Sequence, residues 1–267
     1  MGASLTPIAR NAIIRLVDIH KRFDGFVVLD GVNLSLIEGQ TTVIIGESGC
    51  GKSVLLKHIV RLLRPDRGEV YYRDRRIDNL PERELAKIRP RMGFLFQLNA
   101  LFDSLSVGNN VAYPLREHTR LKRTEIDEIV RHKLAMVGLD GMQSKWPAEL
   151  SGGQKKRVAL ARAIASDPEV ILYDEPTTGL DPPRSDVINE LILKLQRELH
   201  VTSVVVTHDM VSARKVADRV VMLHGGKLIF DGTPDSVMSS DDPRIQCFVD
   251  GRCSAEVLQA LQGAGAT

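Results

Sequence analysis

Hydrophobic and polar positions alternate in the first part of the chain, and this pattern predicts β-strands. The alternating stretches are residues 13–23 and 27–40. The β-branched run 41–46 ends at a glycine, as a buried strand would. Residues 51–63 are apolar at helical spacing and stop before Pro65. The chain is therefore predicted to begin with strands that lead into a helix.

Strand-like and helix-like patterns alternate again in the second half of the chain. Strands are predicted at 169–174, 202–207 and 219–224, with helices between them at 184–199 and 210–218. Alternation at this spacing indicates a parallel sheet covered by helices. One further strand is predicted at 92–97, and residues 68–77 are expected to form one limb of a β-hairpin.

Between about residues 98 and 160 helical periodicity dominates, most clearly at 123–139 and 152–166. This segment predicts a helical subdomain inserted into the α/β sheet. We therefore expect one domain over residues 13–240, followed by a short C-terminal extension over 241–267.

Composition narrows the class of protein. The 267 residues are 43% hydrophobic and 26% charged, which is ordinary for a soluble globular protein. A net charge of +2 gives no reason to expect a nucleic-acid partner. The basic run 61–76 is interpreted as a solvated face, with a membrane-surface or nucleic-acid patch as the alternatives. No apolar run approaches the ~20 residues of a spanning helix.

Three cysteines, Cys50, Cys247 and Cys253, are too few for a disulfide framework, and Cys50 lies in a segment where a bridge would be disruptive. A reducing compartment is therefore expected.

Residues 46–53 read GESGCGKS and match the pattern of a phosphate-binding loop between a strand and a helix. Its glycines allow the backbone to curl so that several N–H groups point inward. The lysine can reach the β- and γ-phosphates of a nucleotide, and the serine hydroxyl can bind Mg²⁺. The predicted nucleotide-binding residues are Gly46, Glu47, Ser48, Gly49, Cys50, Gly51, Lys52 and Ser53.

Polar residues at the ends of other apolar strands are expected at the same sheet edge. Asp174 and Glu175 follow the run VILY, where Asp174 can hold Mg²⁺ and Glu175 can polarise an attacking water. His208 follows another strand and can contact the γ-phosphate. Gln97 can accept from a metal-bound water. Phe23 can stack on a base, or it can simply be a core residue.

A second anion-binding pattern, LSGGQ, occupies residues 150–154 and opens a predicted helix. Its glycines allow close backbone approach, and the helix offers its positive end to a phosphate. One chain thus carries two phosphate cradles, which is redundant if both serve the same nucleotide.

Taken in order, GESGCGKS, Gln97, LSGGQ, ILYDEP, the GLD of residues 179–181 and His208 resemble an ABC-type ATPase domain. The resemblance covers residues 13–240, and LSGGQ is its decisive element. It implies a P-loop NTPase fold with a RecA-like parallel-sheet core, an N-terminal antiparallel β subdomain and an inserted α-helical subdomain. It also implies a head-to-tail homodimer with two ATP molecules in its interface, each between the phosphate loop of one copy and the LSGGQ of the other.

The resemblance assigns roles residue by residue. Ser53, Gln97 and Asp174 would bind Mg²⁺, and Glu175 would be the catalytic base. His208 would sense the γ-phosphate, and Phe23 would stack on adenine, with Phe26 as a substitute. The residues that would complete the partner's site are Ser151, Gly152, Gly153, Gln154 and Asp181.

A narrower resemblance concerns residues 95–119 and 241–251, which are similar to MlaF-type ATPases. That family powers phospholipid transport with a multi-span permease, an MCE-domain protein and, in some systems, a small STAS-domain subunit. It implies a peripheral protein on the cytoplasmic face of a bacterial inner membrane. The alternatives are another ABC importer or exporter, a non-transport ABC ATPase such as the iron–sulfur-assembly type, or a module that senses ATP without turnover.

Overall fold

The computed structural model describes residues 11–251 and contains two sheets. The smaller sheet has the strand order β2-β1-β4-β5 and is antiparallel. Its strands are β1 (Ala12–Phe23), β2 (Phe26–Ile37), β4 (Arg67–Tyr72) and β5 (Arg75–Arg76). This sheet is the antiparallel subdomain implied by the resemblance.

The larger sheet has the order β10-β9-β3-β8-β7-β6, in which all neighbours are parallel except β10 and β9. Its strands are β3 (Thr41–Ile45), β6 (Met92–Leu95), β7 (Val170–Asp174), β8 (Thr202–Thr207), β9 (Arg219–His224) and β10 (Lys227–Gly232). The order places β3, β8 and β7 side by side in the centre. Parallel strands buried on both faces explain the continuous apolar runs in the sequence.

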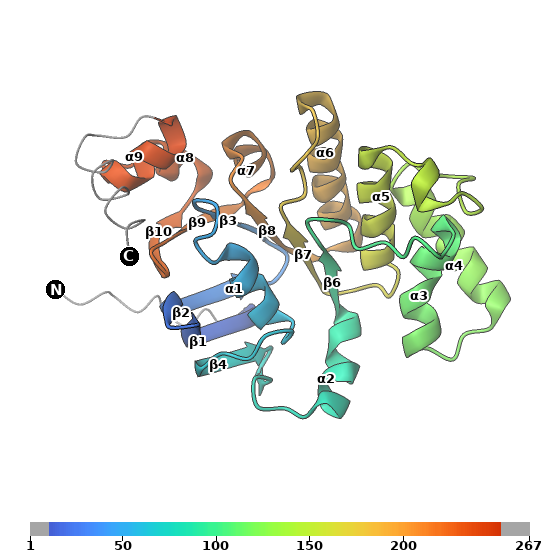
Figure 1. Cartoon of the computed structure of the whole chain (residues 1–267), viewed down its shortest axis with the longest axis horizontal. Helices are drawn as coiled ribbons and strands as arrows, with labels where there is room; N and C mark the ends of the chain where they lie inside the picture. Colours follow the sequence, from blue (N-terminus) through green and yellow to red (C-terminus); the bar gives the residue numbers. More distant parts are fainter. Residues whose placement is uncertain (1–10, 252–267) are drawn as a thin grey trace.

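Helices cover both faces of the larger sheet (Figure 1). They are α1 (Lys52–Ile59), α2 (Glu82–Ile88), α3 (Val107–His118), α4 (Arg123–Met136), α5 (Gly152–Ala163), α6 (Pro182–Leu199), α7 (Met210–Val216), α8 (Pro234–Met238) and α9 (Pro243–Asp250), with 3₁₀ turns η1 (Arg89–Arg91) and η2 (Pro147–Glu149). Helix α1 and the antiparallel sheet lie on one face, while α6 and α7 lie on the other.

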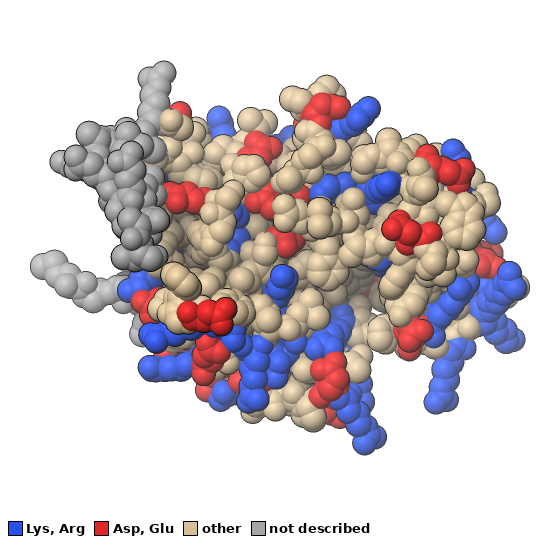
Figure 2. Space-filling view, in the orientation of Figure 1, with Lys and Arg blue, Asp and Glu red and all other residues tan. Residues whose placement is uncertain are grey.

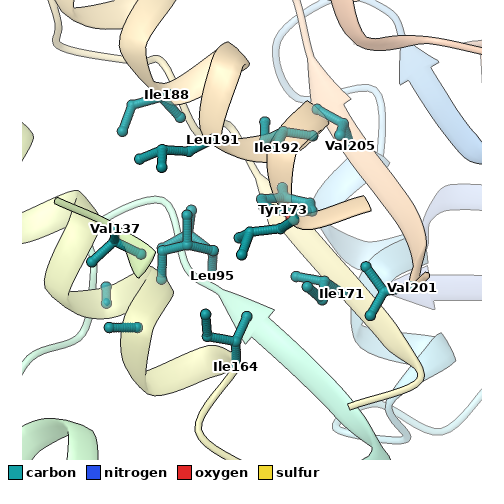
Figure 3. Packing of buried hydrophobic residues seen from close by; sticks show 14 of the residues in the cluster. Leu95, Val137, Ile164, Ile171, Tyr173, Ile188, Leu191, Ile192, Val201 and Val205 are labelled. Atoms are coloured by element: carbon teal, nitrogen blue, oxygen red, sulfur yellow. The ribbon is translucent and has the colours of Figure 1, made fainter. Parts of the chain in front are cut away.

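Two hydrophobic clusters follow from the alternation along each central strand. Val43 and Ile45 of β3 belong to the cluster on the α6 side, whereas Ile44 belongs to the cluster beneath the antiparallel sheet. The α6-side cluster also contains Val137 and Ile164 of the helical segment (Figure 3). The inserted helices and the parallel sheet therefore share one core, so the insert is packed against the sheet rather than tethered to it.

The elements agree with the sequence except at element ends, in helices that were not predicted, and at residues 68–77. That stretch was expected to form one limb of a hairpin, but β4 and β5 pair within it and make both limbs. The helix predicted over 51–63 ends at Ile59, because Arg61 adopts a left-handed φ of 57° and the N–H groups of Leu62 and Leu63 turn back to the carbonyl of Lys57. Helix α3 was not predicted as a separate helix, since Pro114 lies inside it.

The cysteines differ in their state, and no disulfide was predicted from the sequence. Cys50 is free, but Cys247 in α9 is disulfide-bonded. The C-terminal extension is described only as far as residue 251, and its remainder lies outside the described residues.

The basic run forms a solvated face, as interpreted from the sequence. Lys and Arg side chains gather at the lower side of the molecule, around the antiparallel sheet and α2 (Figure 2). Many of them are neutralised by neighbouring acids: Arg67 pairs with Asp18, and Arg75 pairs with Glu84. Within residues 11–251, no helix is long and apolar enough to cross a membrane.

Candidate functional site

The turn between β3 and α1 requires glycine at two positions, Gly46 and Gly51. Gly46 has φ 152°, and a Cβ at this position would lie 2.3 Å from the carbonyl oxygen of Leu223. Gly51 has φ 105°, and its Cβ would lie 2.9 Å from Val28 Cγ1 in β2. The backbone is thus pressed against β9 on one side and the antiparallel sheet on the other, which leaves no room for a Cβ at Gly46 or Gly51.

Lys52 begins α1 and points back into this loop. Its Nζ donates to the carbonyl oxygens of Gly46 and Glu47, each at 2.8 Å, and lies 3.9 Å from Glu175 Oε1. The side chain is buried. An ammonium held by two loop carbonyls at the cavity beside the loop can bind an anion.

Two of the three proposed metal ligands are in direct contact. The Ser53 hydroxyl donates to Asp174 Oδ1 at 2.6 Å. Burial raises the pKa of the Asp174 carboxyl, while the hydrogen bond from Ser53 acts in the opposite direction. A buried carboxylate with oxygen neighbours fits Mg²⁺, which prefers oxygen ligands and whose charge would favour the ionised form. Gln97, just beyond β6, lines the same 310 Å³ cavity as Lys52 and Ser53.

Glu175 leaves β7 with a left-handed φ of 50°, and its N–H donates to the Val206 carbonyl of β8. Its Oε2 contacts His208 Nδ1 at 2.9 Å and accepts from Thr178 Oγ1 at 3.0 Å. One carboxylate oxygen is therefore held in place, and Oε1 is directed towards Lys52. A non-glycine residue in this conformation costs roughly 1–2 kcal/mol, so its neighbours must stabilise it.

Comparison with known proteins agrees with this geometry. Residues 29–178 match the family model described as ABC transporter. The chain is 44% identical over 231 residues to the intermembrane phospholipid transport system ATP-binding protein MlaF of Haemophilus influenzae, covering 86% of this chain and 88% of that protein. The chain belongs to the ABC transporter family. It is one of the family's ATP-binding cassettes.

Other relatives support the same assignment. The cassette is 41% identical over 239 residues to a probable ribonucleotide transport ATP-binding protein of Mycobacterium tuberculosis, which covers 90% of this chain and 67% of that protein. In structure it resembles the cassette MJ0796, solved as a dimer in a post-hydrolysis state with ADP and Pi, with a TM-score of 0.77, 36% identity and coverage of 83% and 98% of the two chains.

The LSGGQ stretch, residues 150–154, is called the signature segment below. It lies away from the phosphate loop of its own chain. Ser151 caps α5 by accepting from Gln154 N at 3.3 Å, while Gln154 Oε1 accepts from Ser151 N at 2.9 Å. A Cβ added at Gly152 would lie 3.9 Å from the Leu180 side chain, and one added at Gly153 would lie 3.9 Å from the Arg184 side chain. Figure 1 shows α1 and α5 well apart, with β7 and α6 between them.

Asp181 caps α6 by accepting from the Arg184 N–H at 3.0 Å, next to the signature segment. Ser151, Gly152 and Asp181 are exposed. The structure therefore gathers the residues predicted to serve a partner on one surface, separate from the cavity that holds Lys52, Ser53 and Glu175.

Two aromatic residues remain candidates for stacking on adenine. Phe23 and Phe26 are paired across the β1–β2 turn, so their side chains lie on the same face. Phe26 is two positions before Val28, which touches the phosphate loop, and alternation along the strand places it on the loop side. Phe26 is 68% exposed and Phe23 is 41% exposed, so both rings are accessible.

Sequence reasoning missed three residues of the site. Thr178 donates to the Glu175 carboxylate, and Val28 packs on the loop. Lys156 of α5 is buried and donates to the carbonyls of Gln97 and Glu175. A signal for Lys156 existed, since it lies three and four residues before the buried Ala159 and Leu160 and therefore on the same helix face.

An apolar groove of about 460 Å³ lies between β6 and α3. Its aromatic lining includes Phe102 and Tyr113, whose ring centroids are 4.8 Å apart, and the stacked pair Phe94 and Phe96. Phe102 and Tyr113 are each 41% exposed. Exposed aromatics lining a concave surface are typical of a protein-binding site.

Proposed function

We propose that this cassette is the ATP-hydrolysing subunit of a transporter that moves phospholipid through a separate membrane permease. The proposal rests on one observation: a short segment connects the nucleotide cavity to the apolar groove. Gln97 lies in the nucleotide cavity, and a few residues later Phe102 lines the apolar groove. A partner in the groove is thereby placed to sense the state of the cavity.

The relatives name two kinds of cargo, and the phospholipid-transport relative is favoured here. The Haemophilus protein is the more identical of the two reported relatives and matches the cassette over nearly its whole length. The mycobacterial protein is matched over two thirds of its length only.

In the proposed reaction, Lys52 and the backbone of the phosphate loop bind the β- and γ-phosphates. Mg²⁺, when bound, supplies positive charge against the phosphate oxygens, and Ser53, Gln97 and Asp174 would hold it. Glu175 accepts a proton from the attacking water, with its carboxylate oriented by His208 and Thr178. His208 would also contact the γ-phosphate.

Two copies would act as a head-to-tail homodimer. The signature residues Ser151, Gly152, Gly153 and Gln154, together with Asp181, would complete the site of the other copy. The surface position of these residues supports the arrangement, because they do not reach the phosphate loop of their own chain. Two phosphate cradles in one chain then serve two different nucleotides.

The partners in this proposal are an integral membrane permease, an MCE-domain protein and a small STAS-domain subunit. The cassette would work at the cytoplasmic face of a bacterial inner membrane. The contact with the permease is assigned to the groove between β6 and α3, because exposed aromatic side chains line it.

The groove assignment can be tested by capture from detergent-solubilised membranes. Tyr113→Asp should lose a multi-span membrane partner, because it places a charge in an apolar contact, yet keep ATP binding. Trp146→Asp is the matched control, since Trp146 is a 49% exposed aromatic of the helical insert outside the groove. Recovery of soluble partners alone by the wild-type chain would contradict transport.

A further inference from the structure

Lys156 is a buried cation whose position the proposed chemistry does not explain. It lies on the first turns of α5, five residues after Ser151, and is only 3% exposed. Within residues 11–251 it forms no salt bridge. Burial lowers the pKa of its ammonium group, and the carboxylates of Glu175 and Asp174 act in the opposite direction. Burying an ammonium group that forms no salt bridge is costly, so the hydrogen bonds it makes must offset that cost.

Those hydrogen bonds join two segments of the nucleotide cavity. Lys156 Nζ donates to the Gln97 carbonyl at 3.0 Å and to the Glu175 carbonyl at 3.2 Å. Both acceptors are backbone carbonyls. Lys156 therefore fixes the backbone positions of Gln97 and Glu175 and leaves their side chains free to bind other groups. Glu175 has a left-handed φ of 50°, and a donor on its carbonyl helps to hold that peptide.

A second cation of the same helix holds the segment that follows Gln97. Arg162 donates from Nη1 to the Ala100 carbonyl at 2.7 Å and from Nη2 to the Asn99 carbonyl at 2.8 Å. Asn99 and Ala100 have φ values of 64° and 49°, so this segment is also in the left-handed region. Side chains of helix α5 therefore donate hydrogen bonds to three backbone carbonyls of residues 97–100.

Helix α5 begins with the signature residues, which lie on the surface that the proposed partner copy would cover. A change in the direction of α5 would move the Lys156 ammonium, and with it the peptides of Gln97 and Glu175. We propose that Lys156 is a positioning residue that couples the signature helix to the proposed metal ligand Gln97 and the proposed base Glu175. This inference rests on the proposed function, because those two roles belong to it.

The test compares two buried lysines in the purified full-length chain. Lys156→Met keeps the length of the side chain and removes its donors. Lys133→Met is the matched control, because Lys133 is also 3% exposed and lies in the helical insert, but its partner is Asp167 rather than the cavity. For both variants the melting temperature, the KM and kcat for ATP, and the affinity for a fluorescent ATP analogue are measured.

Lys156→Met should lower kcat by about tenfold to a hundredfold, since small misplacements of catalytic groups cost that much, while KM and analogue affinity change little. Lys133→Met should lower the melting temperature and leave kcat near the wild-type value. Lys156→Gln retains a donor and should give a kcat between those of wild type and Lys156→Met; it carries the test if Lys156→Met does not fold.

Equal kcat for Lys156→Met and Lys133→Met at equal thermal stability would overturn the inference, as would a change confined to KM. The proposed function fails by a different result. If the wild-type chain does not hydrolyse ATP, or if Glu175→Gln hydrolyses it normally, the roles of the cavity residues are wrong regardless of Lys156.

Discussion

The imidazole Nδ1 of His208 lies 2.9 Å from Oε2 of Glu175, across the ends of two neighbouring strands. Thr178 donates to the same oxygen, so Oε2 is fully engaged. The other oxygen, Oε1, lies on the side of Lys52. The carboxylate is therefore oriented through Oε2, and Oε1, 3.9 Å from Lys52 Nζ, is the oxygen proposed to meet an attacking water.

Replacing Glu175 by glutamine should separate binding from hydrolysis. The amide keeps the shape of the side chain but cannot take a proton, so turnover should fall by about 10²–10⁴-fold. ATP binding should persist and should promote dimerisation, which size-exclusion chromatography with ATP would detect. Glu198→Gln, at an exposed position near the end of α6, should leave turnover unchanged. Normal turnover in Glu175→Gln would show that the base has been misassigned.

His208→Ala should lower kcat, and the effect should depend on Glu175. Because the two side chains act as a unit, adding His208→Ala to Glu175→Gln should cost much less than it costs alone. Steady-state or single-turnover hydrolysis of the four proteins in the cycle measures this coupling. Strict additivity would mean that His208 acts independently of the base.

The phosphate loop offers a comparison between two glycines. Gly46→Ala should abolish nucleotide binding and lower the melting temperature, because the added Cβ would meet the Leu223 carbonyl at 2.3 Å. At Gly49 nothing lies within 4 Å of an added Cβ, although φ is 82°. Gly49→Ala should therefore cost only the backbone strain, roughly 1–2 kcal/mol of unfolding free energy. A larger loss of stability at Gly49 than at Gly46 would contradict the packing described for this loop.

Glu169 should make the stability of the fold depend on pH. It precedes β7 and accepts from Arg73 Nε at 3.1 Å and from Arg91. Burial raises the pKa of this carboxyl, but the hydrogen bonds from the arginines outweigh burial and place it below the ordinary 4.5. The ionised form thus stabilises the fold above that value, and the contribution is lost as the pH falls through the folded pKa.

At neutral pH, Glu169→Gln should lower the unfolding free energy by about 1 kcal/mol. Denaturant unfolding of both proteins at pH 7 and below pH 4 provides the measurement, and the difference between them should shrink in acid. A difference that grows on acidification would have the wrong sign for a lowered pKa.

Much of this site could be predicted because its chemistry fixes the residue types. Gly46 and Gly51 must be glycines, and Asp174 and Glu175 stand out at the end of an apolar strand. Lys156 could not be assigned a role in the same way. Its partners are backbone carbonyls from segments far away in sequence, and carbonyls leave no mark on residue identity.

Elements of the fold were likewise predicted where the sequence pattern is long and regular, and missed where it is short or interrupted. Long periodic segments such as α6 were placed within a few residues. Short helix α2 was missed, because seven residues give too little periodicity. Helix α3 was missed because Pro114 interrupts its pattern, although Ser106 caps it by accepting from Asn109 N at 3.3 Å. The Cys247 disulfide depends on tertiary proximity, which spacing alone does not reveal.

Each nucleotide site is proposed to be shared by two copies of the chain. Ser151→Arg should abolish hydrolysis and leave ATP binding at the phosphate loop intact, whereas Lys52→Met should abolish binding at its own loop. Neither variant alone should hydrolyse ATP.

Mixing the two purified variants is the most direct test of a nucleotide site shared by two chains. A mixed dimer contains one complete site, made from Lys52 of the Ser151→Arg chain and Ser151 of the Lys52→Met chain. The mixture should recover ATP hydrolysis well above the sum of the two separate variants. If both cradles served one nucleotide within a single chain, every chain in the mixture would be defective. No recovery of hydrolysis would show that the nucleotide site is not shared between two chains.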